Sequence, residues 1–150
     1  MIRVLQQTQV LPIDVKAAWA FFSRPDNLND ITPADLSFKV LSELPAAIYA
    51  GLMIRYKIQP FPGVQLNWLT EITHVDEPHY FVDEQRVGPY ALWHHEHHFK
   101  EVPGGTEMTD IVHYRLPLGR VGNLFHGLLV GPKLKRIFDY RKEVLGKKFK

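Results

Sequence analysis

From Leu36 to Leu116 the chain is a series of short runs in which apolar and polar residues alternate. Alternation with a period of two places every second side chain on the same face of a β-strand. Pro, Gly and Asp residues that favour turns separate the runs, as in the segments 60–63 and 103–105. The pattern predicts an antiparallel sheet with one buried face. Its six predicted strands cover residues 36–40, 52–58, 64–72, 81–87, 92–101 and 106–116.

The segments on either side of this series predict one more strand and several helices. Residues 3–11 read as a strand, Asp14 as the N-cap of a helix over 15–22, and residues 26–30 as a second short helix. After residue 120 the apolar residues recur at helical spacing. Gly131-Pro132 interrupts this spacing, so we expect a short helix, a kink near Gly131, and a longer terminal helix. Its sheet-facing residues should be Leu134, Ile137, Phe138, Arg141 and Leu145.

Length, composition and charge limit the number of domains and the kinds of partner that this chain can have. With 150 residues, 45% of them apolar and 23% charged, the chain is expected to form one domain, residues 1–150. A formal net charge of +2 with dispersed basic residues does not favour a nucleic-acid partner, and Lys147, Lys148 and Lys150 read as a solvated helix end. Without cysteine there is no disulfide or thiolate chemistry. We see no signal-peptide core and no integral membrane segment, and therefore expect a cytoplasmic protein.

One predicted strand is rich in histidine. In the segment Trp93-His-His-Glu-His-His-Phe99, alternation places Trp93, His95, His97 and Phe99 on one face of the strand. The neighbouring positions, which include His94 and His98, belong to the opposite, polar face. A strand face that holds two imidazoles between aromatic residues is typical of a ligand pocket, a metal site or a polar core.

The hairpins predict which residues lie opposite these histidines. A four-residue loop at 102–105 would pair His97 with Asp110, His95 with Val112 and Trp93 with Tyr114. A three-residue loop at 88–90 would pair Asp83 with His95 and Gln85 with Trp93. Both inward histidines would then have a carboxylate neighbour close enough for a hydrogen bond.

These pairs have several possible roles. They can satisfy a polar core, orient a ligand, or act as acid–base pairs, with His97, Asp110, His95 and Asp83 as the candidate catalytic residues. His95 and His97 could also bind zinc, but a His-x-His motif needs further ligands, so we predict no metal and no other cofactor. No serine or cysteine motif for nucleophilic catalysis is present.

The element order and several motifs resemble the START-like (SRPBCC) superfamily. The motifs are Gly88-Pro-Tyr90, Trp93-x-His-x-His-x-Phe99, Gly105-Thr106, Tyr114-x-Leu-Pro-Leu-Gly119 and Ile137-Phe-x-Tyr-Arg141. The superfamily includes polyketide cyclases and lipid-transfer domains, and similar bacterial proteins are labelled ligand-binding or cell-division-related. The resemblance implies an α+β helix-grip fold, in which a curved antiparallel sheet of about seven strands wraps around a long C-terminal helix and encloses a cavity.

The leading hypothesis is that this cavity binds a hydrophobic small molecule, such as a lipid or polyketide, without catalysis. The alternatives are a cyclase or aromatase that uses the His–Asp pairs, and a protein-interaction module with a collapsed cavity. We expect a monomer or homodimer. The predicted ligand-binding residues are Tyr56, Trp68, Asp83, Gln85, Trp93, His95, His97, Phe99, Asp110, Val112, Tyr114, Phe125 and Leu129.

Overall fold

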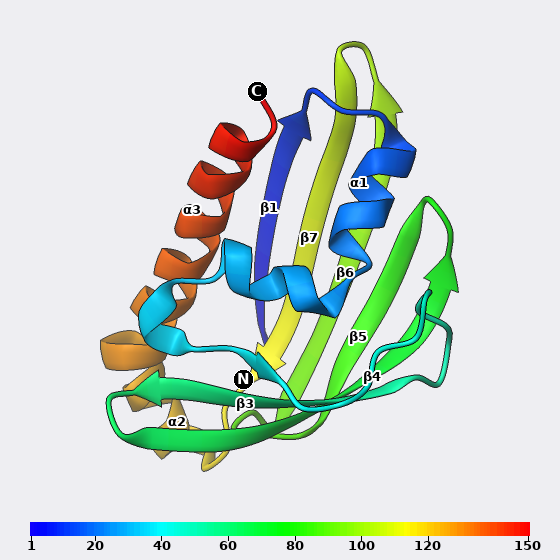
Figure 1. Ribbon diagram of the computed structural model, residues 1–150. Coiled ribbons are helices and arrows are strands. Elements are labelled where there is room, and N and C mark those ends of the chain that lie inside the picture. The colour runs from blue at the N-terminus through cyan, green and yellow to red at the C-terminus, as the bar shows by residue number, and fades with distance from the viewer.

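Seven antiparallel strands form a single curved sheet in the order β1-β7-β6-β5-β4-β3-β2 (Figure 1). The computed structural model describes all residues from 1 to 150. The strands are β1 (Arg3–Leu11), β2 (Lys39–Val40), β3 (Met53–Phe61), β4 (Val64–Asp76), β5 (Tyr80–Val87), β6 (Leu92–Val102) and β7 (Gly105–Arg115). This is the helix-grip fold of the α+β class that the sequence predicts.

The helical segments lie between β1 and β2 and after β7 in the chain. They are α1 (Val15–Phe22), the 3-10 helices Pro25–Ile31 and Ala34–Leu36, α2 (Gly119–Phe125), a π-helical turn (His126–Val130) and α3 (Gly131–Lys148). Helices α1 and α3 pack directly on the sheet. The Asp14 carboxylate accepts a hydrogen bond from the Ala17 backbone N–H at 2.8 Å, which confirms Asp14 as the N-cap of α1. None of the helices has the length and apolarity needed to cross a bilayer.

The predicted strand at residues 36–40 is shorter than expected. Leu36 ends a 3-10 turn that begins after Pro33, and Ser37 adopts a left-handed conformation with φ of 43°. An extended strand cannot continue through that backbone, so only Lys39 and Val40 pair with β3.

At the predicted kink near Gly131, a π-helical turn (His126–Val130) joins α2 to α3. The helix continues through Gly131-Pro132, because the preceding turn widens and the Gly131 N–H donates to the carbonyl of His126, five residues back. Pro132 has no N–H to donate and stands in the first turn of α3, where a missing donor is tolerated. The widened turn therefore accommodates the proline without ending the helix.

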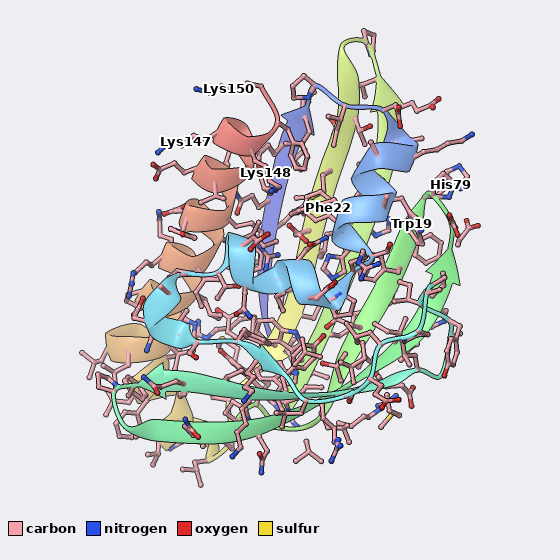
Figure 2. All side chains as sticks on the ribbon, viewed as in Figure 1. Trp19, Phe22, His79, Lys147, Lys148 and Lys150 are labelled. Carbon is pink, nitrogen blue, oxygen red and sulfur yellow. The ribbon has the colours of Figure 1, made fainter.

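The predicted sheet-facing side of α3 is confirmed. Leu134, Phe138, Arg141 and Leu145 are buried, and Ile137 is half-buried. Leu134 and Phe138 pack on the β7 end of the sheet, while Leu145 packs with residues of β1, β6 and β7. Trp19 and Phe22 of α1, labelled in Figure 2, pack on Phe99 of the sheet, and Lys147, Lys148 and Lys150 lie at the C-terminal end of α3.

The strand register that the hairpins predict is confirmed for β6 and β7. Trp93 lies opposite Tyr114, His95 opposite Val112, and His97 opposite Asp110. On the other side of β6, Asp83 of β5 lies opposite His95. The regular ladder between β5 and β6 ends at the pair of Glu84 with His94. The predicted pairing of Gln85 with Trp93 is therefore not part of the ladder.

Candidate functional site

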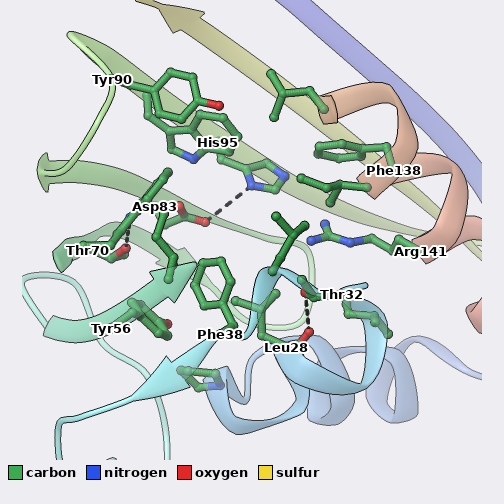
Figure 3. Close-up of a pocket in the computed structure, with 18 of the residues that line it drawn as sticks. Leu28, Thr32, Phe38, Tyr56, Thr70, Asp83, Tyr90, His95, Phe138 and Arg141 are labelled. Carbon is green, nitrogen blue, oxygen red and sulfur yellow. Dashed lines mark hydrogen bonds and ion pairs between the residues drawn. The ribbon is translucent and has the colours of Figure 1, made fainter. Parts of the chain in front are cut away.

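A cavity of about 310 Å³ lies between the sheet, α3 and the 3-10 helix Pro25–Ile31 (Figure 3). Strands β3 to β6 form its floor. Most of its lining is apolar, and the side chains that define it include Leu28, Phe38, Tyr56, Trp68, Tyr90, Trp93, Leu134 and Phe138. The size and lining are those of a small-molecule site.

Aromatic side chains form one wall of this cavity. The Trp68 ring packs edge-to-face with Trp93 at a centroid distance of 5.4 Å and with Tyr90 at 5.8 Å. The Trp68 indole N–H donates to the Thr70 hydroxyl at 3.0 Å, which fixes the ring. Burial raises the pKa of Tyr56 and of Tyr90 above the usual tyrosine value, so both hydroxyls stay protonated.

A compact polar cluster forms part of the floor beside this wall. Asp110 Oδ1 accepts a hydrogen bond from His95 Nε2 at 2.9 Å and lies 3.1 Å from His97 Nδ1. Asp83 Oδ2 accepts from His97 Nε2 at 2.7 Å and lies 3.8 Å from His95 Nδ1. The two imidazole rings lie 3.8 Å apart, and His97 stacks on Phe81 at 4.2 Å. Each histidine therefore contacts both carboxylates.

This arrangement confirms the predicted register and adds contacts that the register does not predict. The strand register places Asp83 opposite His95 and Asp110 opposite His97, and His97 does lie within reach of Asp110 as expected. The hydrogen bonds with good geometry nevertheless run diagonally, from His95 to Asp110 and from His97 to Asp83. Diagonal neighbours on adjacent strands are within reach of long side chains, so opposition in the ladder does not by itself select the partner.

The pKa values of the two histidines are shifted in opposite directions. Burial lowers the pKa of His95, and the neighbouring His97 lowers it further, against the opposing effect of the carboxylates. Burial also lowers the pKa of His97, but its contacts with Asp110 and Asp83 outweigh burial and raise it overall. Burial raises the pKa of both carboxyl groups, yet their hydrogen bonds to the histidines hold those pKa values below the usual range. The cluster favours one imidazolium between two carboxylates.

Arg141 brings a second cation to the cluster from α3. Its side chain is 9% exposed, and its Nη1 lies 3.8 Å from Asp110 Oδ2, which is too far for a hydrogen bond. The guanidinium lies over the Phe138 ring, 4.9 Å from its centroid. Both Arg141 Nε and Asp110 Oδ2 are buried without a hydrogen-bond partner. Arg141 lines the cavity.

Seven of the predicted ligand-binding residues line the cavity. They are Tyr56, Trp68, Asp83, Trp93, His95, His97 and Leu129. What these residues bind stays a prediction, since position alone does not show it.

Six predicted ligand-binding residues lie elsewhere. The Gln85 side chain bonds the backbone of Tyr90 at 2.7 and 3.0 Å and so shapes the loop. Phe99 packs under α1 in the core, and Asp110 and Val112 are buried beneath the cavity floor. The Tyr114 hydroxyl hydrogen-bonds His126 Nε2 at 2.7 Å, and Phe125 is 48% exposed. The predicted residues on the inner face of the sheet are covered, because α1 and α3 pack directly on that part of the sheet.

Sequence reasoning missed several residues of the site. Tyr90 follows a turn and Leu28 belongs to a 3-10 helix, so no strand periodicity indicates them. Phe38 does belong to the predicted alternating run 36–40, but that run alone does not show that it reaches the cavity. Arg141 was assigned to the sheet-facing side of the helix but not to the site. A charged residue on an otherwise apolar helix face was the signal available for it.

The cluster can support metal binding or acid–base chemistry. Asp83, His95 and His97 offer ligand atoms that all lie within 4.8 Å of one another, a set that fits zinc or another divalent transition metal. The same groups hydrogen-bond one another without a metal. A histidine whose pKa is raised from 6.5 can also donate or accept a proton near neutral pH.

The sequence profile of a known family, "Polyketide cyclase / dehydrase and lipid transport", matches residues 11–140. The chain belongs to this family. The family description names polyketide cyclases and dehydrases, which are enzymes, together with lipid transport. A comparison with curated proteins gives no match.

Solved structures similar to this chain share the fold over nearly its whole length. A protein from Chromobacterium violaceum, CV1439, gives a TM-score of 0.74 at 13% identity, covering 98% of this chain and 97% of that one. TTHA0849 from Thermus thermophilus gives 0.69 at 16% identity, covering 95% and 97%. Ms6760 from Mycobacterium smegmatis gives 0.67 at 19% identity, covering 97% and 92%. At these identities the likeness establishes the fold alone.

Proposed function

We propose that this protein binds a hydrophobic small molecule in the cavity between the sheet and α3. The observation that carries the proposal is the contrast within the cavity, which has an extended aromatic and aliphatic lining and one compact group of charged side chains. Apolar area supplies affinity, and a few placed polar groups fix orientation. The family, which includes lipid transport, supports a ligand of this kind.

A cyclase-like enzyme is the second candidate, favoured by one specific observation. His97 lines the cavity, contacts two carboxylates, and has a pKa raised from 6.5 by them. Such a group suits general acid–base catalysis at neutral pH. Turnover of a poly-β-ketone substrate that is lost in His97→Gln would favour the enzyme. Tight binding without turnover would favour the carrier. The third alternative, a collapsed cavity, is not supported by the open volume of about 310 Å³.

Binding of a hydrophobic fluorescent probe should depend on the cavity wall. Trp68 is 8% exposed and forms the centre of that wall, so Trp68→Ala should weaken binding of a naphthalene-sulfonate probe by about tenfold or more. Ile137→Trp should also weaken it, because the indole would fill the cavity from α3. Tyr49→Ala, at a side chain that is 55% exposed and outside the cavity, is the matched control.

Probe titration, with thermal unfolding curves for every variant, decides this prediction. Equal affinity in the native protein, Trp68→Ala and Ile137→Trp would show that the probe binds elsewhere and would count against the cavity as the site.

The protein is expected to bind its ligand without a metal. His97 donates a hydrogen bond to Asp83 at 2.7 Å and lies 3.1 Å from Asp110. A proton between the imidazole and the carboxylate therefore already occupies the position that a metal cation would take. Elemental analysis after purification without chelators should find far less than one transition metal per chain. One zinc per chain, lost in the double variant His95→Ala/His97→Ala, would overturn this expectation.

A further inference from the structure

Arg141 is a buried hydrogen-bond donor whose capacity the chain does not use. A guanidinium carries donors only, and leaving such donors unpaired away from water is costly. Here Nε has no partner, and Nη1 stays 3.8 Å from the carboxylate of Asp110. The side chain is 9% exposed, so bulk water does not compensate fully. In Figure 3 the guanidinium points from α3 toward His95, across the cavity.

The cation is held in this place by the chain itself. Asp110 attracts it from below and the Phe138 ring supports it from the side, at 4.9 Å. A guanidinium fixed in this way loses little conformational entropy when it pairs with a further acceptor. Its position beside the apolar lining means that an acceptor atom of a bound molecule can reach it while the rest of the molecule contacts the aromatic wall.

The charges of the cluster select the kind of acceptor. Asp83 and Asp110 contribute two negative charges, Arg141 contributes one positive charge, and at most a protonated histidine adds a second, so the cluster has no excess positive charge to offer an anion. A carboxylate would add an uncompensated negative charge to a largely apolar cavity, which is unfavourable. A carbonyl oxygen offers lone pairs to the guanidinium and adds no charge.

We propose that Arg141 binds the carbonyl oxygen of an uncharged, apolar ligand, and that the substrate class of the cavity is therefore aromatic or aliphatic ketones and related neutral carbonyl compounds. This assignment rests on the proposed function, because it requires a ligand in the cavity. It gives Arg141 a recognition role in addition to its ion pair with Asp110.

Three naphthalene probes test the assignment: 2-acetylnaphthalene, 2-ethylnaphthalene and 2-naphthoate. They share one apolar ring system and differ in a carbonyl, a methylene or a carboxylate at the same place. Displacement of the fluorescent probe should show that the native protein binds the ketone about tenfold or more tightly than the ethyl compound, as expected for a hydrogen bond to a charged group. The carboxylate should bind less tightly than the ketone.

Arg141→Met should remove this preference, leaving the ketone and the ethyl compound with equal affinity. Arg141→Lys keeps the charge beside Asp110 and loses the planar fork, so it should fold and retain only part of the preference. Tyr140→Ala, on the outward side of α3, should keep the full preference. An unchanged preference in Arg141→Met, or tightest binding of the carboxylate in the native protein, would overturn the assignment.

A spectroscopic reading on the native protein makes the test independent of whether variants fold. The carbonyl stretch of ¹³C-labelled 2-acetylnaphthalene should shift to lower frequency on binding, relative to its value in hexane, because a guanidinium polarises the bond. A bound frequency equal to that in hexane would contradict the assignment. Equal binding of the ketone and the ethyl compound would refute the role of Arg141 alone. Failure of all three compounds to bind would refute the proposed function as well.

Discussion

Replacing Asp110 by asparagine should lower the free energy of unfolding by about 3–5 kcal/mol, because it leaves buried cations without their counter-charge. Asp110 is 1% exposed and lies within 4 Å of three cationic or potentially cationic side chains, His95, His97 and Arg141. The amide keeps the shape of the carboxylate but not its charge. Denaturant unfolding at neutral pH measures the loss.

An exposed carboxylate provides the control for this variant. Asp139 pairs with Lys135 on the outer side of α3, and its side chain is 61% exposed. Asp139→Asn should cost less than about 0.5 kcal/mol, since solvent screens exposed ion pairs. Equal losses in the two variants would show that Asp110 has no special electrostatic role.

The cost of Asp110→Asn should also depend on pH. The pKa of His97 is raised in the native protein. This group therefore contributes its full stabilisation at pH values below 6.5, its usual pKa, and loses that contribution as the pH rises through its native pKa. The lowered pKa of Asp110 acts oppositely, stabilising above its usual 3.8 and less as the pH falls through its native value. The destabilisation should therefore be largest between these two regions and shrink in alkaline solution. A loss that stays constant from weakly acidic to alkaline pH would exclude the imidazolium as its cause.

The sequence predicted the sheet better than the site because the sheet follows from local rules. Alternation and two hairpin loops were enough to place His97 opposite Asp110 and Asp83 opposite His95. The diagonal hydrogen bonds depend on side-chain rotamers and on the stacking of His97 against Phe81, neither of which a strand pattern contains.

The boundary of the cavity was the least predictable feature. Phe99, Val112 and Tyr114 lie on strand positions that face inward, but α1 or α3 packs directly on them and excludes a ligand. Tyr90 and Phe38 line the cavity from irregular segments instead. Which part of an inner sheet face is covered depends on how helices cross it, and that is a property of the tertiary packing.

Replacing Phe138 by alanine should lower the free energy of unfolding by about 3–5 kcal/mol, through lost burial and the space left behind. The side chain is 4% exposed and packs with Val112 and Leu134, where α3 meets β7. Its ring also supports the Arg141 guanidinium at 4.9 Å and lies 6.0 Å from the His95 ring. The substitution therefore removes both the apolar contact that holds α3 on the sheet and part of the support of the polar cluster.

Tyr140→Ala is the matched control, since it removes an aromatic ring from the same helix two residues away. Tyr140 is 37% exposed, so its loss should cost less than about 1 kcal/mol. Urea titrations of the two variants and the native protein give the comparison. A loss well under 1 kcal/mol for Phe138→Ala would mean that this face of α3 does not hold the helix on the sheet. A large loss with unchanged ketone preference would separate the structural role of Phe138 from the positioning of Arg141, because the guanidinium would then be held by Asp110 alone.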